Sequence, residues 1–109
     1  MAIAYGTMLL SEKRNARVTI TPQSPATTLT IASATVTLYD SSGNVAGGVS
    51  AASATFDTGA QAAPRVWFLL RPSVLAIVPG VYSVAFLVTD SAGFVYEPVL
   101  SITIKADGS

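Results

Sequence analysis

The 109-residue sequence predicts an all-β protein, folded as an antiparallel β-sandwich of seven to eight short strands. Apolar and polar residues alternate over several short runs, as they do in strands that bury one face. The tetrapeptide Asp-Ser-x-Gly occurs at 40–43 and again at 90–93, each time directly after such a run. Asp and Ser bond nearby backbone and Gly accepts a positive φ, so both copies are expected to be turns that join two strands. Short strands with turn signals between them are typical of a sandwich or barrel.

The N-terminal half begins with a segment that has no clean period. Residues 1–16 are therefore expected to form an N-terminal arm or an edge strand, and 17–106 the sandwich domain. The first regular alternation is at 17–21, and Pro22 ends it. Further strands are expected at 27–31, 34–39, 44–49 and 51–56, the third of them weakened by two adjacent glycines.

The C-terminal half contains the most apolar run of the chain, Val66-Trp67-Phe68-Leu69-Leu70. Because this run is continuous, it predicts a strand at 65–71 whose middle is covered on both faces. Pro72 can start a helical turn, so a crossover with one such turn is expected at 72–78. The remaining strands are expected at 81–89, 94–96 and 99–105, and 107–109 is expected to be a flexible tail.

The residue inventory argues against an enzyme. The chain has no His and no Cys, which zinc sites prefer and which supply common bases and nucleophiles. It also lacks a Gly-x-Ser-x-Gly motif. Three of its six acidic residues, Asp40, Asp57 and Asp90, are expected to open turns and to bond local backbone. We therefore expect no catalytic residue, no cofactor and no metal site.

Charge is sparse and balanced, with six basic and six acidic residues and a formal net charge of zero. Lys13, Arg14 and Arg17 cluster, but Glu12 lies beside them and three cations are too few for a nucleic-acid groove. The apolar start lacks the basic residues of a signal peptide, and no apolar stretch is long enough to span a bilayer. Neither nucleic acid nor a membrane is expected as a partner.

Two features resemble the immunoglobulin-like sandwiches. Gly80-Val81-Tyr82 opens a long strand, as in the tyrosine corner, where the hydroxyl bonds backbone upstream. Val84 stands where antibody domains place a cysteine. Trp67 lies too close to Tyr82 to be the strand-C tryptophan of antibodies, so its strand more resembles strand E. The resemblance is therefore to the broader sandwich class and not to antibody domains.

Over about residues 14–105 the chain looks like the immunoglobulin-like modules of bacteriophage tail, baseplate and capsid-surface structural proteins. The segments that carry this resemblance are 34–40 with its turn, 66–70, 79–82 and 102–104. The resemblance implies a non-enzymatic structural or assembly protein of a phage or prophage virion, made in the bacterial cytoplasm. It would bind other virion proteins or itself, as a homo-oligomer. Fold-level analogy of this kind does not fix a function.

Two groups of residues are candidates for partner binding: the large side chains of the N-terminal segment and the aromatic residues near the two turns. They are Ile3, Tyr5, Met8, Leu9, Leu10, Tyr39, Phe94 and Tyr96. The first group would dock on a neighbouring molecule if the segment is an arm. The alternative function is a carbohydrate- or receptor-binding module of a bacterial surface adhesin, in which Tyr39, Phe94 and Tyr96 form a stacking platform.

Overall fold

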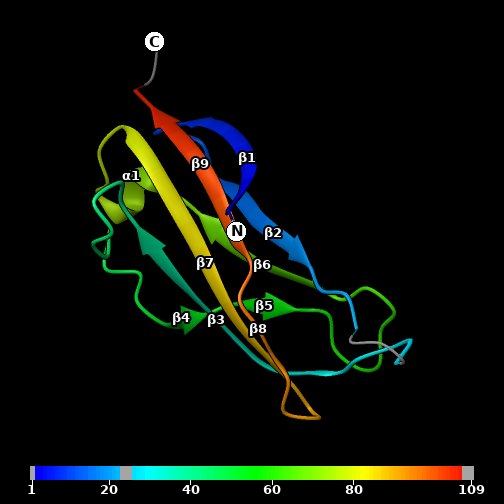
Figure 1. Cartoon of the computed structure of the whole chain (residues 1–109). Helices are drawn as coiled ribbons and strands as arrows, with labels where there is room; N and C mark the ends of the chain where they lie inside the picture. The colour runs from blue at the N-terminus through cyan, green and yellow to red at the C-terminus, as the bar shows by residue number, and fades with distance from the viewer. Residues whose placement is uncertain (1, 23–25, 107–109) are drawn as a thin grey trace.

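Two β-sheets pack face to face in the computed structural model, which describes residues 2–22 and 26–106 (Figure 1). Of residues 2–5 and 74 it describes the backbone alone. The elements are β1 (Ala2–Leu9), β2 (Arg14–Thr19), β3 (Ile31–Tyr39), β4 (Ala52–Ser53), β5 (Thr55–Phe56), β6 (Arg65–Leu70), α1 (Pro72–Leu75), β7 (Gly80–Asp90), β8 (Val95–Tyr96) and β9 (Val99–Lys105). The expected all-β fold is confirmed.

The larger sheet has the strand order β1-β9-β7-β3-β4, with β8 paired to β7, and the smaller sheet has the order β2-β6-β5. Every pair but one is antiparallel. The exception is β1, which runs parallel to β9, so the expectation of a purely antiparallel sandwich is wrong at this edge. The physical reason is the connection: β1 leads through a short turn into β2 of the other sheet and has no hairpin partner in its own sheet.

Three of the expected strands are not formed as the alternation suggested. Of the strand expected at 27–31, Leu29 makes only an isolated bridge to Gln61, and Ile31 already belongs to β3. Residues 44–49 are a loop with one bridge to β3, from Val45 to Tyr39, and backbone hydrogen bonds from Ala46 to Leu38 (2.8 Å) and from Leu38 to Val49 (3.0 Å). Gly47 and Gly48 both have positive φ there, which ends any regular extension. Residues 51–56 divide into β4, which pairs with β3, and β5, which pairs with β6. The chain thus passes from one sheet to the other within six residues.

The core lies between the sheets and follows the alternation of the long strands. Buried residues of the larger sheet include Val36, Leu38, Val84, Phe86, Val88, Leu100, Ile102 and Ile104, and those of the smaller sheet include Ala16, Val18, Val66 and Leu70. The expectation that β6 is covered on both faces is wrong, since Leu69 is 44% exposed. The smaller sheet covers the core with one face and leaves the other, with Leu69 and Trp67, on the outside of the sandwich.

The crossover from β6 to β7 contains the expected helical turn, α1, which begins at Pro72. It is followed by Ala76 in the left-handed conformation, with a φ of 56°. The hydroxyl of the buried Tyr82 then donates a hydrogen bond of 2.6 Å to the carbonyl oxygen of Val78. This bond fastens the start of β7 to the end of the crossover, as the tyrosine-corner resemblance implied.

Candidate functional site

The two Asp-Ser-x-Gly segments form the same turn. In the first, Oδ1 of Asp40 accepts hydrogen bonds from the backbone N–H groups of Ser42 (2.9 Å) and Asn44 (3.0 Å). In the second, Oδ1 of Asp90 accepts from the N–H groups of Ala92 (3.0 Å) and Phe94 (2.9 Å). The prediction that both carboxylates are occupied by local backbone is confirmed.

The two turns lie at opposite ends of the sandwich. Strands β3 and β7 are antiparallel, so Tyr39 at the end of β3 pairs with Ser83 near the start of β7, while Asp90 pairs with Ile31. The length of β3 separates the two turns by about 26 Å at ~3.3 Å per residue. The structure therefore does not bring Tyr39 together with Phe94 and Tyr96, and the three cannot form one platform.

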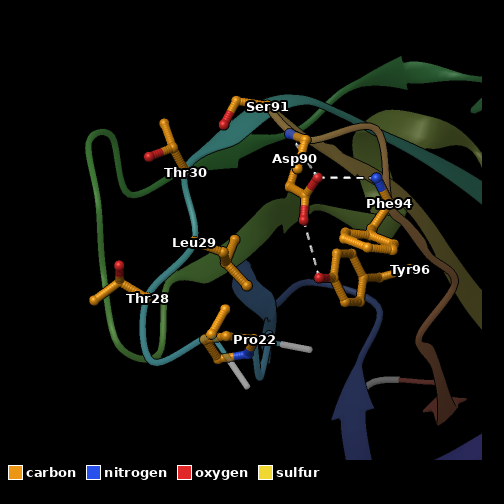
Figure 2. Close-up of a pocket in the computed structure, with 10 residues that line it drawn as sticks. Pro22, Thr28, Leu29, Thr30, Asp90, Ser91, Phe94 and Tyr96 are labelled. Carbon is orange, nitrogen blue, oxygen red and sulfur yellow. Dashed lines mark hydrogen bonds between the residues drawn. The ribbon is translucent and has the colours of Figure 1, made fainter. Parts of the chain in front are cut away.

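A hollow of about 180 Å³ lies beside the second turn (Figure 2). Asp90, Phe94 and Tyr96 form one wall of this tip hollow, and Leu29 and Pro22 lie across from them. It is smaller than the roughly 300–1,000 Å³ of typical small-molecule sites. Phe94 is 50% exposed at its rim.

Both oxygens of the Asp90 carboxylate accept hydrogen bonds in the wall of the tip hollow. Besides the two backbone N–H groups, the carboxylate accepts a hydrogen bond of 3.0 Å on Oδ2 from the hydroxyl of Tyr96 (Figure 2). Asp90 is only 6% exposed. A carboxylate with three donors and little access to solvent has a structural role here, and it is not placed to take a proton from a substrate.

The candidate residues of the N-terminal segment belong to an edge strand of the sandwich. Met8 is buried in the core, and Leu10 packs against it. Met8 is thus not available to a partner, because β1 is hydrogen-bonded along β9 and carries this side chain between the sheets. Leu9 is partly buried, and the side chains of Ile3 and Tyr5 lie outside what the structure describes.

Asp57 is the third carboxylate expected to open a turn, and here the expectation is wrong. Its Oδ2 accepts hydrogen bonds from the backbone N–H (3.0 Å) and from Nε (2.9 Å) of Arg65, and its Oδ1 from Nη2 (3.3 Å). The hydrogen bonds from the Arg65 side chain and backbone hold the pKa of Asp57 below its ordinary value, and the same pair raises the pKa of Arg65. Sequence spacing missed this pair because the two residues meet only when β5 pairs with β6.

The basic residues at 13–17 do not form one patch, because Arg14 and Arg17 lie on opposite sides of β2. Arg14 forms an ion pair of 3.1 Å with Glu12, whose other oxygen accepts the backbone N–H of Leu9. Arg17 points to the opposite side of β2, away from the core.

Within 2–22 and 26–106, no group of three acidic residues is close enough to hold a metal ion. In the same part of the chain, no helix combines the length and the apolar character needed to cross a bilayer.

The outer face of the larger sheet is a surface that the sequence analysis did not single out. Its outward side chains at 35–39 of β3, 81–89 of β7 and 99–103 of β9 are uncharged, and Lys105 adds one charge on the same face at the end of β9. Leu87 is 47% exposed on this face. A hollow of about 290 Å³ lies there, bordered by Tyr39, Leu87 and Val99 and, at its margin, by the charged Glu97. Alternation within each strand could have revealed this face, had the strand order been known.

Comparison with known proteins gives the fold and no family. No protein-family model matches the chain, and no curated protein sequence matches it. Among solved structures, it is similar to a chain of a family 123 glycoside hydrolase from Clostridium perfringens, described for glycolipid glycan hydrolysis. The TM-score is 0.58 at 11% sequence identity, over 94% of this chain and 23% of that chain. Since this chain corresponds to less than a quarter of the hydrolase chain, the likeness is one of fold alone.

Proposed function

We propose that this protein is a non-enzymatic structural module of a phage or prophage virion, with an immunoglobulin-like fold, and that it acts through protein contacts. The observation that carries this proposal is the outer face of the larger sheet, whose centre is uncharged and whose charged residues, Glu97 and Lys105, lie at its margins. Its partner would be another virion protein or a second copy of the chain. Tail, baseplate and capsid surface are the positions that the sequence resemblance implies.

The strand order supports the immunoglobulin-like part of the proposal. If β2, β3, β5, β6, β7 and β9 are lettered B to G, the sheets read B-E-D and G-F-C, which are the two sheets of that fold. Strand β4 then takes the place of C′ beside C. The hydrogen bond from Tyr82 to Val78 falls at the corner between E and F.

The outer face of the larger sheet has the composition of a protein interface, with an uncharged centre and charges at its margins. Interface centres are depleted in charged residues, whereas exposed faces of ordinary monomers are interspersed with them. A standard interface buries about 800 Å² per partner. That is roughly an eighth of the 6002 Å² of accessible surface of this protein. With a formal net charge of zero, the protein also offers no long-range repulsion between copies.

Sedimentation equilibrium tests self-association through this face with a matched pair of variants. Leu87→Arg places a charge on the outer face of the larger sheet, and Leu69→Arg places one on the smaller sheet at nearly the same exposure, 47% against 44%. We expect the unmodified protein and Leu69→Arg to form oligomers, and Leu87→Arg to sediment as the 11.2 kDa monomer. Oligomers that Leu87→Arg leaves unchanged would exclude this face.

The virion assignment has a separate test in the genome. Reading frames for capsid, tail-tube or fibre proteins are expected beside this one, because virion genes are clustered. If the unmodified protein remains monomeric, the proposed partner is a different virion protein and not a second copy of the chain. Neighbouring genes with no relation to a virion would overturn the assignment itself.

The alternative is a carbohydrate- or receptor-binding module of a bacterial surface adhesin. The distance between Tyr39 and the second turn removes the three-residue platform on which this alternative was based. What favours it now is the half-exposed ring of Phe94 beside Tyr96 at the tip hollow. A glycan array probed with the protein and with Phe94→Ala tests it, and signals that do not depend on Phe94 would exclude that site.

A further inference from the structure

The outer face of the smaller sheet has a different chemistry from that of the larger sheet, because it combines an aromatic ring with arginine side chains at its centre. Trp67 lies at its centre, in register with Arg17 on β2 and with Thr55 on β5. Asn15 and Arg65 complete this group, which we call the Trp67 patch, and a hollow of about 230 Å³ is bordered by Asn15, Arg17, Arg65 and Trp67. Trp67 is partly exposed, although the sequence analysis assigned it to the core.

The charges of the Trp67 patch are unbalanced. The guanidinium carbon of Arg65 lies 5.9 Å from the centroid of the Trp67 ring system, but Arg65 is also held by the carboxylate of Asp57. Arg17 is exposed and has no hydrogen bond or ion pair within the part of the chain that the structure describes. Arg17 acts on the carboxylate of Asp57 only through its charge, which helps to lower the pKa of Asp57. Two guanidinium groups thus face one carboxylate, and the patch has one positive charge in excess.

We propose that the Trp67 patch binds an acidic saccharide, a pyranose that carries a carboxylate. The apolar C–H face of the sugar ring would lie on Trp67, as sugars do on exposed aromatic side chains. Arg17, one strand away in direct register, would bind the carboxylate with its planar pair of donors. Asn15 and Thr55 border the ring with the amide and hydroxyl groups that sugar hydroxyls require.

Other ligands fit the Trp67 patch less well. A nucleic acid needs a track of several uncompensated cations, and the patch has one. A neutral sugar would use the ring and leave Arg17 without a function. An acidic protein segment could use Arg17, and it is therefore one of the outcomes of the test. The proposal concerns the opposite sheet from the interface proposed above, so either can fail without the other.

Fluorescence titration can test the proposal because Trp67 is the single tryptophan of the chain. The whole protein is titrated with an oligogalacturonate, with a neutral galactose oligomer of the same length, and with polyglutamate. We expect a saturable change with the oligogalacturonate alone. Arg17→Gln is expected to weaken that binding about tenfold or more, since a charge-assisted pair is lost. Lys105→Gln removes the same charge from the larger sheet and is expected to leave the affinity unchanged.

Trp67→Phe gives a second readout, measured by calorimetry because the fluorophore is gone. Retained far-UV circular dichroism shows that the variant is folded, and weaker binding with a folded variant supports stacking on this ring. No saturable signal with oligogalacturonate overturns the proposal. If Arg17→Gln and Lys105→Gln lose the same affinity for oligogalacturonate, the proposed site is wrong, because the binding is then a general attraction between charges. Equal binding of polyglutamate overturns the saccharide in favour of an acidic protein segment.

Discussion

The hydroxyl of Tyr96 donates a hydrogen bond of 3.0 Å to Oδ2 of Asp90, six residues earlier in the chain, and is the third donor to a carboxylate that already accepts two backbone N–H groups. The matching position after Asp40 is Ala46, which has no hydroxyl. The two turns are thus alike in backbone and different in how their carboxylates are held. Asp90 is buried, whereas Asp40 is partly exposed.

This difference predicts unequal losses of stability for the same substitution. Asp90→Ala removes a buried acceptor with three donors and is expected to lower the free energy of unfolding by about 2–3 kcal/mol. Asp40→Ala removes two bonds at the surface and is expected to lower it by about 1 kcal/mol. Urea denaturation measures both. Equal losses would show that the Tyr96 bond and the burial of Asp90 contribute nothing.

The local hydrogen bonds of the two turns could be predicted from the sequence, but the positions of the turns in the molecule could not. Asp, Ser and Gly act within five residues of chain, so the local bonds of Asp40 and Asp90 could be foreseen. Which end of the molecule each turn occupies depends on the pairing of β3 with β7, which is a long-range property. The separation of Tyr39 from Phe94 could therefore not be foreseen, nor could the meeting of Asp57 with Arg65.

The hydrogen bond from Tyr82 to Val78 gives a second prediction. Tyr82→Phe keeps the ring and removes the hydroxyl, which leaves the carbonyl oxygen of Val78 without this donor. We expect the free energy of unfolding to fall by about 1–2 kcal/mol, measured by thermal and urea denaturation. Tyr39→Phe is the matched control, since the Tyr39 hydroxyl has no hydrogen bond within the described residues. An unchanged stability in Tyr82→Phe would mean that water replaces the bond.

Strand pairing and the outward side of β6 could not be predicted from the sequence, because both depend on contacts between distant parts of the chain. Alternation indicates that a strand has two different faces, but it does not give the partner strand or its direction, and so the parallel pairing of β1 with β9 was missed. The run at 66–70 has no alternation at all. Trp67 and Leu69 look like core residues there, although the register of β6 places them on the outer face.

The Asp57–Arg65 pair predicts a dependence of stability on pH. The pKa of Asp57 is lower in the folded protein than its ordinary value of 3.8, so the unfolded chain binds a proton more readily. The stabilisation is therefore fully present above that value and is lost as the pH falls through the folded pKa. We expect Asp57→Asn to be less stable than the unmodified protein at neutral pH and the difference to shrink in acid. A difference that is independent of pH would contradict the ion pair, and added salt should reduce it at neutral pH.

The loop at 44–49 provides a matched pair of glycines for the last prediction. Gly47 and Gly48 have φ values of 62° and 69°, so alanine at either position takes on a left-handed conformation. A Cβ on Gly47 would also lie 3.0 Å from Cβ of Leu75 and 3.1 Å from Cγ2 of Ile77, whereas one on Gly48 meets nothing within 4 Å. We expect Gly48→Ala to lower the free energy of unfolding by about 1 kcal/mol and Gly47→Ala by about 2–4 kcal/mol, because crowding is added to the backbone strain.

The contribution of left-handed backbone strain to stability can also be measured by removing it. Ala76, which follows α1, has a φ of 56°. Ala76→Gly relieves the left-handed strain and is expected to raise the free energy of unfolding by up to about 1 kcal/mol. Urea denaturation of the three variants separates the two effects. If Gly47→Ala and Gly48→Ala lose the same amount while Ala76→Gly gains, backbone strain alone accounts for the loop, and the contact of Gly47 with the α1 crossover has no energetic role.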